Sequence, residues 1–404
     1  MQPPDRLPTC SSNHHDSAIC GRVKLFLYYL KKPGLLPAFL IAVFIYPYAG
    51  NCFAETTRQT SKTVFSITTI ADGLEHPWGM AFLPDGRILV TERPGRLRII
   101  RQGKLQDDAV TGLPAIAARG QGGLLDVVLH PDYVNNGWLY FSYVTGNGNR
   151  TGTEVGRGRL SGNHIADWQT LFSLQPKSTA GRHFGSRLIF DRDNYLYITL
   201  GDRGERFRAQ DLNDHAGSVI RLHDDGSIPA DNPFVNQPGK KPEIYSYGHR
   251  NSQGAALHPQ TGRIWIHEHG PQGGDELNVI APGNNYGWPV ITFGKEYGSG
   301  EDIGDGTHKA GMQQPVYYWV PSIAPSGMAF YNGDRFPDWQ GNLFVGSLKF
   351  RLLVRLELEG MNVVKEERLL KNEIGRIRDV RVGPDGFIYL LTDEKNGKLV
   401  RLQL

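Results

Sequence analysis

The chain has 404 residues, with 44 Lys/Arg against 41 Asp/Glu, and its three cysteines all lie before residue 55. The first 54 residues hold five basic and two acidic side chains, which leaves 39 of each sign in the remainder. That remainder lacks the excess basic charge that binds nucleic acid or acidic membranes, and it can form no disulfide, thiolate metal site or cysteine nucleophile.

The first 54 residues have the composition of an export signal. A basic stretch ending in Lys31 and Lys32 precedes an apolar run over 35–48 of about 14 residues, and Cys52-Phe53-Ala54 offers a small-residue cleavage pattern. The run is shorter than the roughly 20 residues of a membrane span. We therefore predict a secretory signal with an extended front over 1–54. The mature chain is then one domain over 55–404, without a membrane span, periplasmic or secreted; a retained signal anchor is the alternative.

From residue 64 the chain repeats a short strand, a turn of Pro, Asp and Gly, and a second strand rich in β-branched and aromatic residues. The six units lie at 79–92, 123–141, 186–199, 255–266, 327–346 and 378–392. One hairpin cannot bury its apolar face, but six can pack radially as four-stranded antiparallel blades. We predict an all-β, six-bladed β-propeller in which 64–70 adds a strand to the last blade. A β-sandwich or two all-β domains are the alternatives.

Polar side chains stand at equivalent points around blades two to six. They are Gln121, His183, Arg250, Asn251, Lys349, Arg376 and Arg378. The ordinary pKa of a histidine suits a general base at neutral pH, although a lone histidine is more often a hydrogen-bonded surface residue. Arg376 and Arg378, two apart on an extended chain, face the same way. Their convergence predicts a cationic pocket for an anionic, polycarboxylate ligand, while Arg250 by itself could equally bridge two blades.

The loop over 267–276 follows a predicted strand and offers carboxylates, backbone carbonyls and little side-chain bulk. Hard cations such as calcium bind oxygen ligands of this kind, whereas a glycine-rich polar hairpin explains the same residues without a metal. His267 and His269 alternate on one strand face, but the spacing supplies no third ligand for zinc.

Four segments together resemble one family: 120–125, 248–251, 269–276 and 376–379 look like those of the soluble PQQ-dependent aldose sugar dehydrogenases, relatives of soluble quinoprotein glucose dehydrogenase. The resemblance covers nearly all of 64–404. It implies PQQ on the axial face with calcium beneath it, and His183 as general base. The implied PQQ contacts are Gln121, Arg250, Asn251, Tyr297, Lys349, Arg376 and Arg378. The implied metal ligands are the carbonyls of Gly270 and Pro271 for the PQQ-bound calcium, and Glu276 and Tyr286 for a further calcium.

The reaction implied by the resemblance is oxidation of an aldose at its anomeric carbon to a lactone. His183 takes the hydroxyl proton, hydride passes to PQQ, and an unidentified acceptor removes the electrons. Arg182 stands where the glucose dehydrogenase branch has an acidic residue, and His269 where it has a glutamine. These departures fit broader aldose specificity. The alternatives are a calcium-dependent lactonase and a non-catalytic binding propeller.

Overall fold

The computed structural model describes residues 58–59, 63–147 and 149–404. The signal predicted at 1–54 lies outside them, and the predicted location depends on it. In the described part of the chain, no helix is long and apolar enough to cross a membrane. The helices there are short: α1 (Tyr133–Asn136) and the 3-10 turns η1 (Arg206–Gln210) and η2 (Pro337–Trp339).

The strands form six antiparallel sheets in chain order. The first sheet comprises β3 (Pro77–Phe82), β4 (Ile88–Glu92), β5 (Arg96–Arg101) and β6 (Lys104–Leu105). The second comprises β7 (Leu124–Leu129), β8 (Trp138–Asn147), β9 (Arg150–Ser161) and β10 (His164–Ser173). The third comprises β11 (Leu188–Phe190), β12 (Leu196–Thr199), β13 (Ser218–Leu222) and β14 (Ile244–Tyr247).

The remaining three sheets follow the same plan. The fourth comprises β15 (Ser252–Leu257), β16 (Ile264–Glu268), β17 (Asp275–Val279) and β18 (Tyr317–Trp319). The fifth comprises β19 (Pro325–Phe330), β20 (Leu343–Ser347), β21 (Leu352–Glu359) and β22 (Asn362–Leu369). The last contains β23 (Ile377–Val382), β24 (Ile388–Thr392) and β25 (Gly397–Gln403), joined by β2 (Val64–Leu74) and β1 (Arg58–Gln59).

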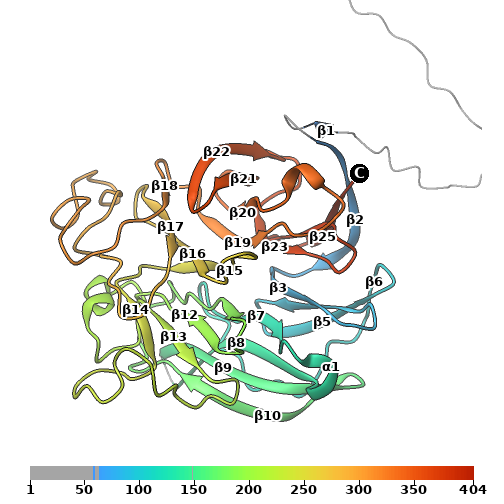
Figure 1. The fold of residues 1–404 in the computed structure, drawn as a ribbon. Coiled ribbons are helices and arrows are strands. Elements are labelled where there is room, and N and C mark those ends of the chain that lie inside the picture. The colour runs from blue at the N-terminus through green and yellow to red at the C-terminus, as the bar shows by residue number, and fades with distance from the viewer. Residues whose placement is uncertain (1–57, 60–62, 148) are drawn as a thin grey trace, which may run out of the picture. The chain divides into compact units, whose positions relative to one another are not determined.

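The first strand of each sheet is innermost, and these strands close a ring. Neighbouring contacts run β3–β7, β7–β11, β11–β15, β15–β19, β19–β23 and back from β23 to β3. The ribbon accordingly passes from blue through green and yellow to red around the molecule (Figure 1). The predicted six-bladed β-propeller is confirmed, and each predicted repeat unit forms the first two strands of one blade.

The turns between these paired strands contain residues that make the repeats recognisable in the amino-acid sequence. Gly86 has a φ of 85°, which favours glycine, and the Asp85 carboxylate accepts the backbone N–H of Arg87 at 3.0 Å. The last blade repeats the device at 384–386, where Gly386 has a φ of 78°. In each turn, the Asp carboxylate supplies a hydrogen bond and the glycine adopts the positive φ, so the turn needs no contact with residues elsewhere in the chain.

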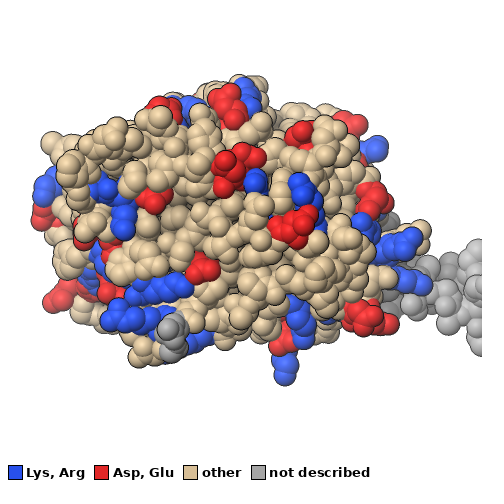
Figure 2. Space-filling model, turned by 90° about the horizontal axis from the view of Figure 1, so that it is seen from below, with Lys and Arg blue, Asp and Glu red and all other residues tan. Residues whose placement is uncertain are grey.

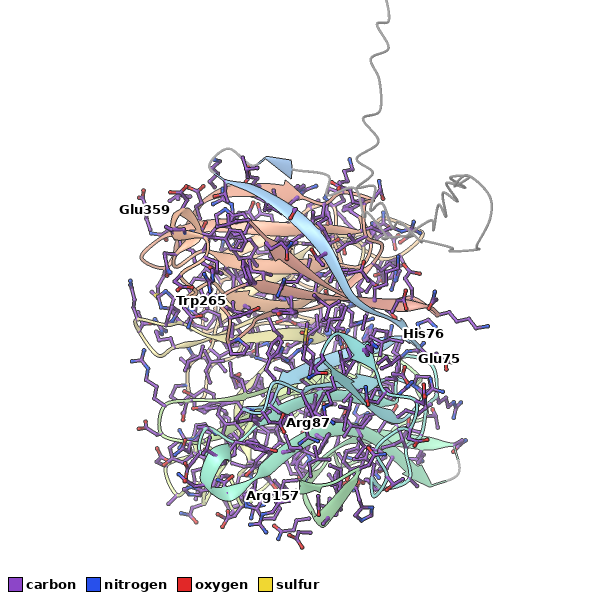
Figure 3. The ribbon with its side chains drawn as sticks, turned by 90° about the vertical axis from the view of Figure 1, so that its right-hand side faces the viewer. Glu75, His76, Arg87, Arg157, Trp265 and Glu359 are labelled. Carbon is purple, nitrogen blue, oxygen red and sulfur yellow. The ribbon has the colours of Figure 1, made fainter. Side chains whose placement is uncertain are left out.

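Ring closure joins the two ends of the described chain. β2 pairs antiparallel with β25, with Ile67 opposite Leu402, so the last sheet has five strands. Figure 3 shows β2 running along the strands of the last blade towards the labelled Glu75 and His76. The predicted closing strand is therefore confirmed. Pairing the first strand with the last covers a sheet edge and holds the ring together.

The six largest apolar clusters of the core lie one between each pair of successive blades. Tyr140 packs between the second and third blades, Trp265 between the fourth and fifth, and Trp339 between the fifth and last. Acidic and basic side chains are interspersed over the face drawn in Figure 2. Blade-to-blade burial of this kind fixes the inner strands and hence the loops at their ends.

A buried ring of four charges crosses the axis. Arg187 contacts Asp126 and Asp379, each at 3.0 Å, and Arg381 contacts the same two carboxylates at 2.8 and 3.0 Å. Glycine is required beside it, because a Cβ on Gly327 would lie 2.3 Å from an Asp379 carboxylate oxygen. The alternating charges link the inner strands of the second, third and last blades.

Candidate active site

Loops at the ends of the inner strands line a half-open cavity of about 920 Å³. Of the residues predicted from the sequence, it is lined by Gln121, Asn251, Gly270, Pro271, Tyr297, Lys349, Arg376 and Arg378. His183 stands next to Phe184 and Gly185, which belong to the wall. Residues from five blades and from positions over 250 apart in the chain therefore meet at one place.

His183 forms the centre of a buried hydrogen-bonded unit. Its Nδ1 lies 2.6 Å from Asp202 Oδ1, and Trp288 Nε1 donates to Asp202 Oδ2 at 2.8 Å. The backbone N–H of Gly204 also donates to Asp202 Oδ1 at 2.6 Å. A carboxylate accepts, so Nδ1 carries the imidazole proton and Nε2 has its lone pair free. No described residue hydrogen bonds to Nε2, and the side chain is 11% exposed.

The surroundings of His183 keep it neutral. Burial lowers its pKa below the ordinary value, and the positive charge of Arg250 lowers it further, against the raising effect of Asp202. For Asp202, burial acts to raise the pKa, but the bond from His183 and the charge of Arg250 outweigh it and the pKa is lowered. A neutral imidazole held by an ionised carboxylate is a general base ready at neutral pH.

The backbone of His183 is also held in place. It has a φ of 54°, a left-handed conformation that is uncommon for a residue with a side chain. Its N–H donates to Gln121 Oε1 at 2.8 Å. Gly201 leaves room for the His183 carbonyl, which would otherwise lie 2.2 Å from a Cβ. Strain of this kind is retained at functional sites where the neighbouring structure enforces it.

Arg376 and Arg378, on the cavity wall, both donate to the carboxylate of Asp393, a residue that sequence reasoning missed. Asp393 Oδ2 accepts from Arg378 at 2.6 Å and from Arg376 at 3.3 Å, and His76 Nδ1 lies 3.0 Å from Asp393 Oδ1. Burial would raise the pKa of Asp393, but Arg378, His76 and Arg376 hold it well below its usual range. The two arginines do face the same way, as their spacing predicts.

The cavity remains cationic with Asp393 included. Its wall carries Arg93, Lys349, Arg376 and Arg378 against Asp393 and Glu394, a net charge of +2. Among the described residues, the ammonium group of Lys349 has no hydrogen-bonding partner, and the buried Nε of Arg378 has none either. Unpaired donors on the wall of a cavity fit an anionic ligand.

Arg250 acts on the glycine-rich loop rather than on the cavity wall. Its guanidinium donates to the carbonyls of His269 at 3.0 Å and Gly270 at 2.7 Å, and its buried Nε has no partner among the described residues. No described residue donates to the Pro271 carbonyl. Arg250 therefore fixes the glycine-rich loop of its own blade, and Gly270 and Pro271 of that loop line the cavity. These two contacts do not bridge two blades.

The two acidic residues at the end of this loop, Asp275 and Glu276, have different surroundings. Asp275 pins the loop, accepting the N–H of Gly270 at 2.9 Å and two N–H groups of the fifth blade, and burial raises its pKa to about 6. Glu276 lies beside Glu268, and both approach the Asn278 amide at 3.3 Å. Burial and then the charge of Glu268 raise the pKa of Glu276 well above its usual value.

The Tyr286 hydroxyl and the two histidines of the loop are already engaged in other contacts or lack further ligands among the described residues. The hydroxyl of Tyr286 is already engaged, because it donates to the carbonyl of Val279 at 2.7 Å and accepts the N–H of Ala281 at 3.1 Å. Over the described ranges, no three His, Cys, Asp or Glu side chains are grouped so as to hold a metal ion. His267 and His269 are not part of such a group; His269 contacts the Pro325 carbonyl, and burial lowers its pKa to about 3.

Comparison with known proteins decides the family. The glucose/sorbosone dehydrogenase family matches residues 74–401. The chain belongs to this family. It is 47% identical over 357 residues to the aldose sugar dehydrogenase of Escherichia coli K12, covering 87% of this chain and 96% of that protein. The family and this relative make it a sugar-oxidising oxidoreductase, and the resemblance stated from the sequence is confirmed.

Solved structures of the family have the same fold. The apo-form of the soluble aldose sugar dehydrogenase of Escherichia coli superposes with a TM-score of 0.82 at 46% identity, covering 84% of this chain and 99% of that chain. The PQQ-bound form of the aldose sugar dehydrogenase of Streptomyces coelicolor gives 0.69 at 29% identity, covering 84% and 98%.

Three site residues were missed by sequence reasoning: Asp202, Trp288 and Asp393. Asp202 had a signal, since it follows the second strand of the blade that His183 precedes, within Gly201-Asp202-Arg203-Gly204. The argument that polar residues at strand ends converge on one site applies equally to an acidic residue at this position. Asp393 had the same signal, since it directly follows β24, the second strand of the last blade. Trp288 had none, because it lies 86 residues from Asp202 in an unremarkable segment.

Proposed function

We propose that the protein catalyses the PQQ- and calcium-dependent oxidation of aldoses at the anomeric carbon to lactones, with His183 as general base. The observation that carries the proposal is the neutral His183, held by Asp202 at 2.6 Å, beside a cationic cavity of about 920 Å³. A dehydrogenase of this kind needs a base, an enclosed anionic redox cofactor and room for a sugar. The relative from Streptomyces coelicolor, solved with PQQ, supports the choice of cofactor.

The cavity wall fits a polycarboxylate. Lys349 and the Nε of Arg378 are donors without a partner among the described residues, and Arg376 stands beside them. Gln121 uses its carbonyl oxygen for His183, which leaves its amide N–H groups for a ligand. These residues, with Asn251 and Tyr297 on the same wall, would hold PQQ, while Arg250 would act through the loop it supports.

Two places fit a hard cation. The Pro271 carbonyl, free of hydrogen bonds from the described residues, and the Gly270 carbonyl beside it would hold a calcium next to PQQ. Glu276 and Glu268 form a buried carboxylate pair, and burial together with the charge of Glu268 raises the pKa of Glu276. Within the described part of the chain, a buried carboxylate of this kind lacks a compensating positive charge. A cation would supply it, with the Tyr286 backbone as a further ligand because its hydroxyl is engaged.

The chain's own residues supply the proton chemistry. His183 Nε2 accepts the proton of the anomeric hydroxyl, and Asp202 stabilises the imidazolium that results. Trp288 and Gly204 hold Asp202 in position so that the imidazole keeps one tautomer. When bound, PQQ supplies the acceptor for the hydride, with calcium as the Lewis acid that polarises it.

Reconstitution tests the proposal directly. Metal is removed from the purified protein, PQQ and calcium are added, and dye reduction is followed with a panel of aldoses. Turnover that requires both additions, and its loss in His183→Gln with PQQ still bound by absorbance titration, is the expected result. Failure of the wild-type protein to bind PQQ would remove the proposal and favour a lactonase or a binding propeller.

A further inference from the structure

Besides Arg250, three arginines lie near the His183–Asp202 pair, and they differ in their partners. Arg203 is buried and donates to the carbonyls of Arg182 and Ala180. Arg206 pairs through both terminal nitrogens with Glu296. Arg182 is exposed, and its guanidinium has no hydrogen-bonding or ion-pair partner among the described residues.

Among the residues that the structure describes, the carboxylates near Arg182 already have other partners. Asp202 is taken by His183 and Trp288, and Glu205 accepts from Ser178 at 2.5 Å and lies 3.5 Å from Arg208. The positive charge of Arg182 still reaches His183, since it is among the causes that lower the histidine's pKa. Arg182 is exposed and directly precedes His183 in the chain, so its charge is available to a molecule bound at the base.

The position of Arg182 is fixed by its neighbours. Its carbonyl accepts from Arg203, the preceding Gly181 carbonyl accepts the N–H of Gln121 at 2.8 Å, and the following N–H of His183 donates to the same glutamine. The guanidinium packs on Gly204, where a Cβ would lie 2.4 Å from Arg182 Nε. Gly204 donates in turn to Asp202, so the guanidinium rests on the unit that holds the base.

We propose that Arg182 binds a carboxylate of the substrate, and that the preferred substrates are acidic aldoses of the uronic acid class. The inference rests on the proposed function and names its substrate. A guanidinium pairs with a carboxylate through two parallel hydrogen bonds. In a uronic acid in its ring form, only the ring oxygen and one carbon separate the anomeric carbon from the carboxylate. A sugar whose anomeric hydroxyl meets His183 therefore carries its charge close to the base.

The remaining choice among anions follows from charge. A single guanidinium balances one carboxylate, whereas a phosphate carries about two negative charges at neutral pH and is commonly bound by a cluster of cations. Arg206 is committed to Glu296 and Arg203 to backbone carbonyls. A carboxylate is the better match for one free guanidinium.

The reaction on such a substrate balances as for a neutral aldose. The anomeric hydroxyl gives its proton to His183, and the anomeric carbon gives a hydride to the redox cofactor of the proposed function. The hydroxyl oxygen becomes the lactone carbonyl, so a uronic acid yields the monolactone of a dicarboxylic sugar acid. The substrate's carboxylate is unchanged and serves only for binding.

The test compares matched sugars on the full-length protein loaded with PQQ and calcium. Glucuronate and glucose share the reacting carbon, and glucose 6-phosphate carries a phosphate instead. The wild-type kcat/KM should be higher for glucuronate than for glucose and should fall with ionic strength. In Arg182→Gln it should fall by about 10- to 100-fold for glucuronate and by less than about threefold for glucose. Arg182→Lys should retain part of the preference, and Arg101→Gln, an exposed arginine on β5, should retain all of it.

A binding measurement separates recognition from turnover. Methyl β-glucuronide and methyl β-glucoside have no free anomeric hydroxyl and cannot be oxidised at that carbon. Calorimetric titration of the loaded protein should detect tighter binding of the glucuronide, and Arg182→Gln should remove the difference.

The outcomes distinguish failure of the proposed Arg182–carboxylate contact from failure of the proposed dehydrogenase activity. Oxidation of glucose with no preference for glucuronate, or equal losses on both sugars in Arg182→Gln, would overturn the inference and leave the dehydrogenase intact. A higher kcat/KM for glucose 6-phosphate would overturn the assignment of a carboxylate. Oxidation of neither class by PQQ-loaded protein would remove the proposed function and the inference with it.

Discussion

Replacing Asp202 by asparagine tests the proposed proton chemistry with a change of one atom and one charge. Asp202 Oδ1 accepts from His183 Nδ1 at 2.6 Å and from the Gly204 N–H at 2.6 Å, while Oδ2 accepts from Trp288 Nε1 at 2.8 Å. An amide offers one oxygen and one NH2 group. Whichever way it turns, one of these buried donors meets a donor.

Both orientations weaken the base. If the NH2 group faces His183, Nδ1 must accept and the proton moves to Nε2, so the lone pair needed for catalysis is lost. If the oxygen faces His183, the tautomer survives but the carboxylate that stabilises the imidazolium is gone. We expect kcat to fall by roughly 10²- to 10⁴-fold, the range for losing general-base function or its tautomer control.

Steady-state kinetics with absorbance titration of PQQ measures this effect. The PQQ affinity should be unchanged, because Asp202 is absent from the cavity wall. Asp202 acts to raise the pKa of His183, so the acid limb of the residual activity should move to lower pH. Asp193→Asn, in an exposed turn of the same blade, is the control. A kcat within about threefold of wild type at full PQQ loading would refute the role given to Asp202.

Four further outcomes follow from the same contacts. Trp288→Phe keeps an aromatic ring but removes one donor to Asp202, and kcat should fall by about tenfold without loss of PQQ binding; an unchanged kcat would make that bond unimportant. Because the pKa of His183 is lowered, kcat/KM in wild type should be at its plateau at pH 7 and decline only below about 6.5, whereas a decline beginning above neutrality would contradict a depressed pKa. Calcium at about 100 times its dissociation constant at pH 8 should stabilise the fold by about 2.7 kcal/mol in thermal unfolding. The same calcium concentration should stabilise the fold less at pH 5, since a raised pKa leaves Glu276 protonated in acid, and less in Glu276→Gln at pH 8. Gly327→Ala should lower the free energy of unfolding by about 1–3 kcal/mol in denaturant titration, because its Cβ would meet Asp379; full stability would show that the axial charges can shift.

The amino-acid sequence alone determined the repeat plan of this protein. Strand pairs joined by turns such as 84–86 depend on neighbouring residues, since Asp85 and Gly86 satisfy the turn themselves. Six hairpins that cannot stand alone imply a ring. Gln121 and Lys349 occupy matching points of successive repeats. The repeat pattern therefore predicts that both line the same cavity, as they do in the structure.

Only the tertiary structure decided which groups meet across that ring. Asp202 reaches Trp288 over 86 residues, and Arg378 reaches Gln253 over 125, at contacts that no local pattern encodes. The same holds for Arg182, because its lack of a partner among the described residues depends on which side chains the fold brings near it. Local turns and strand periods arise from backbone geometry within a few residues, whereas charge pairing and pKa values depend on burial and distance, which exist only once the six blades have closed.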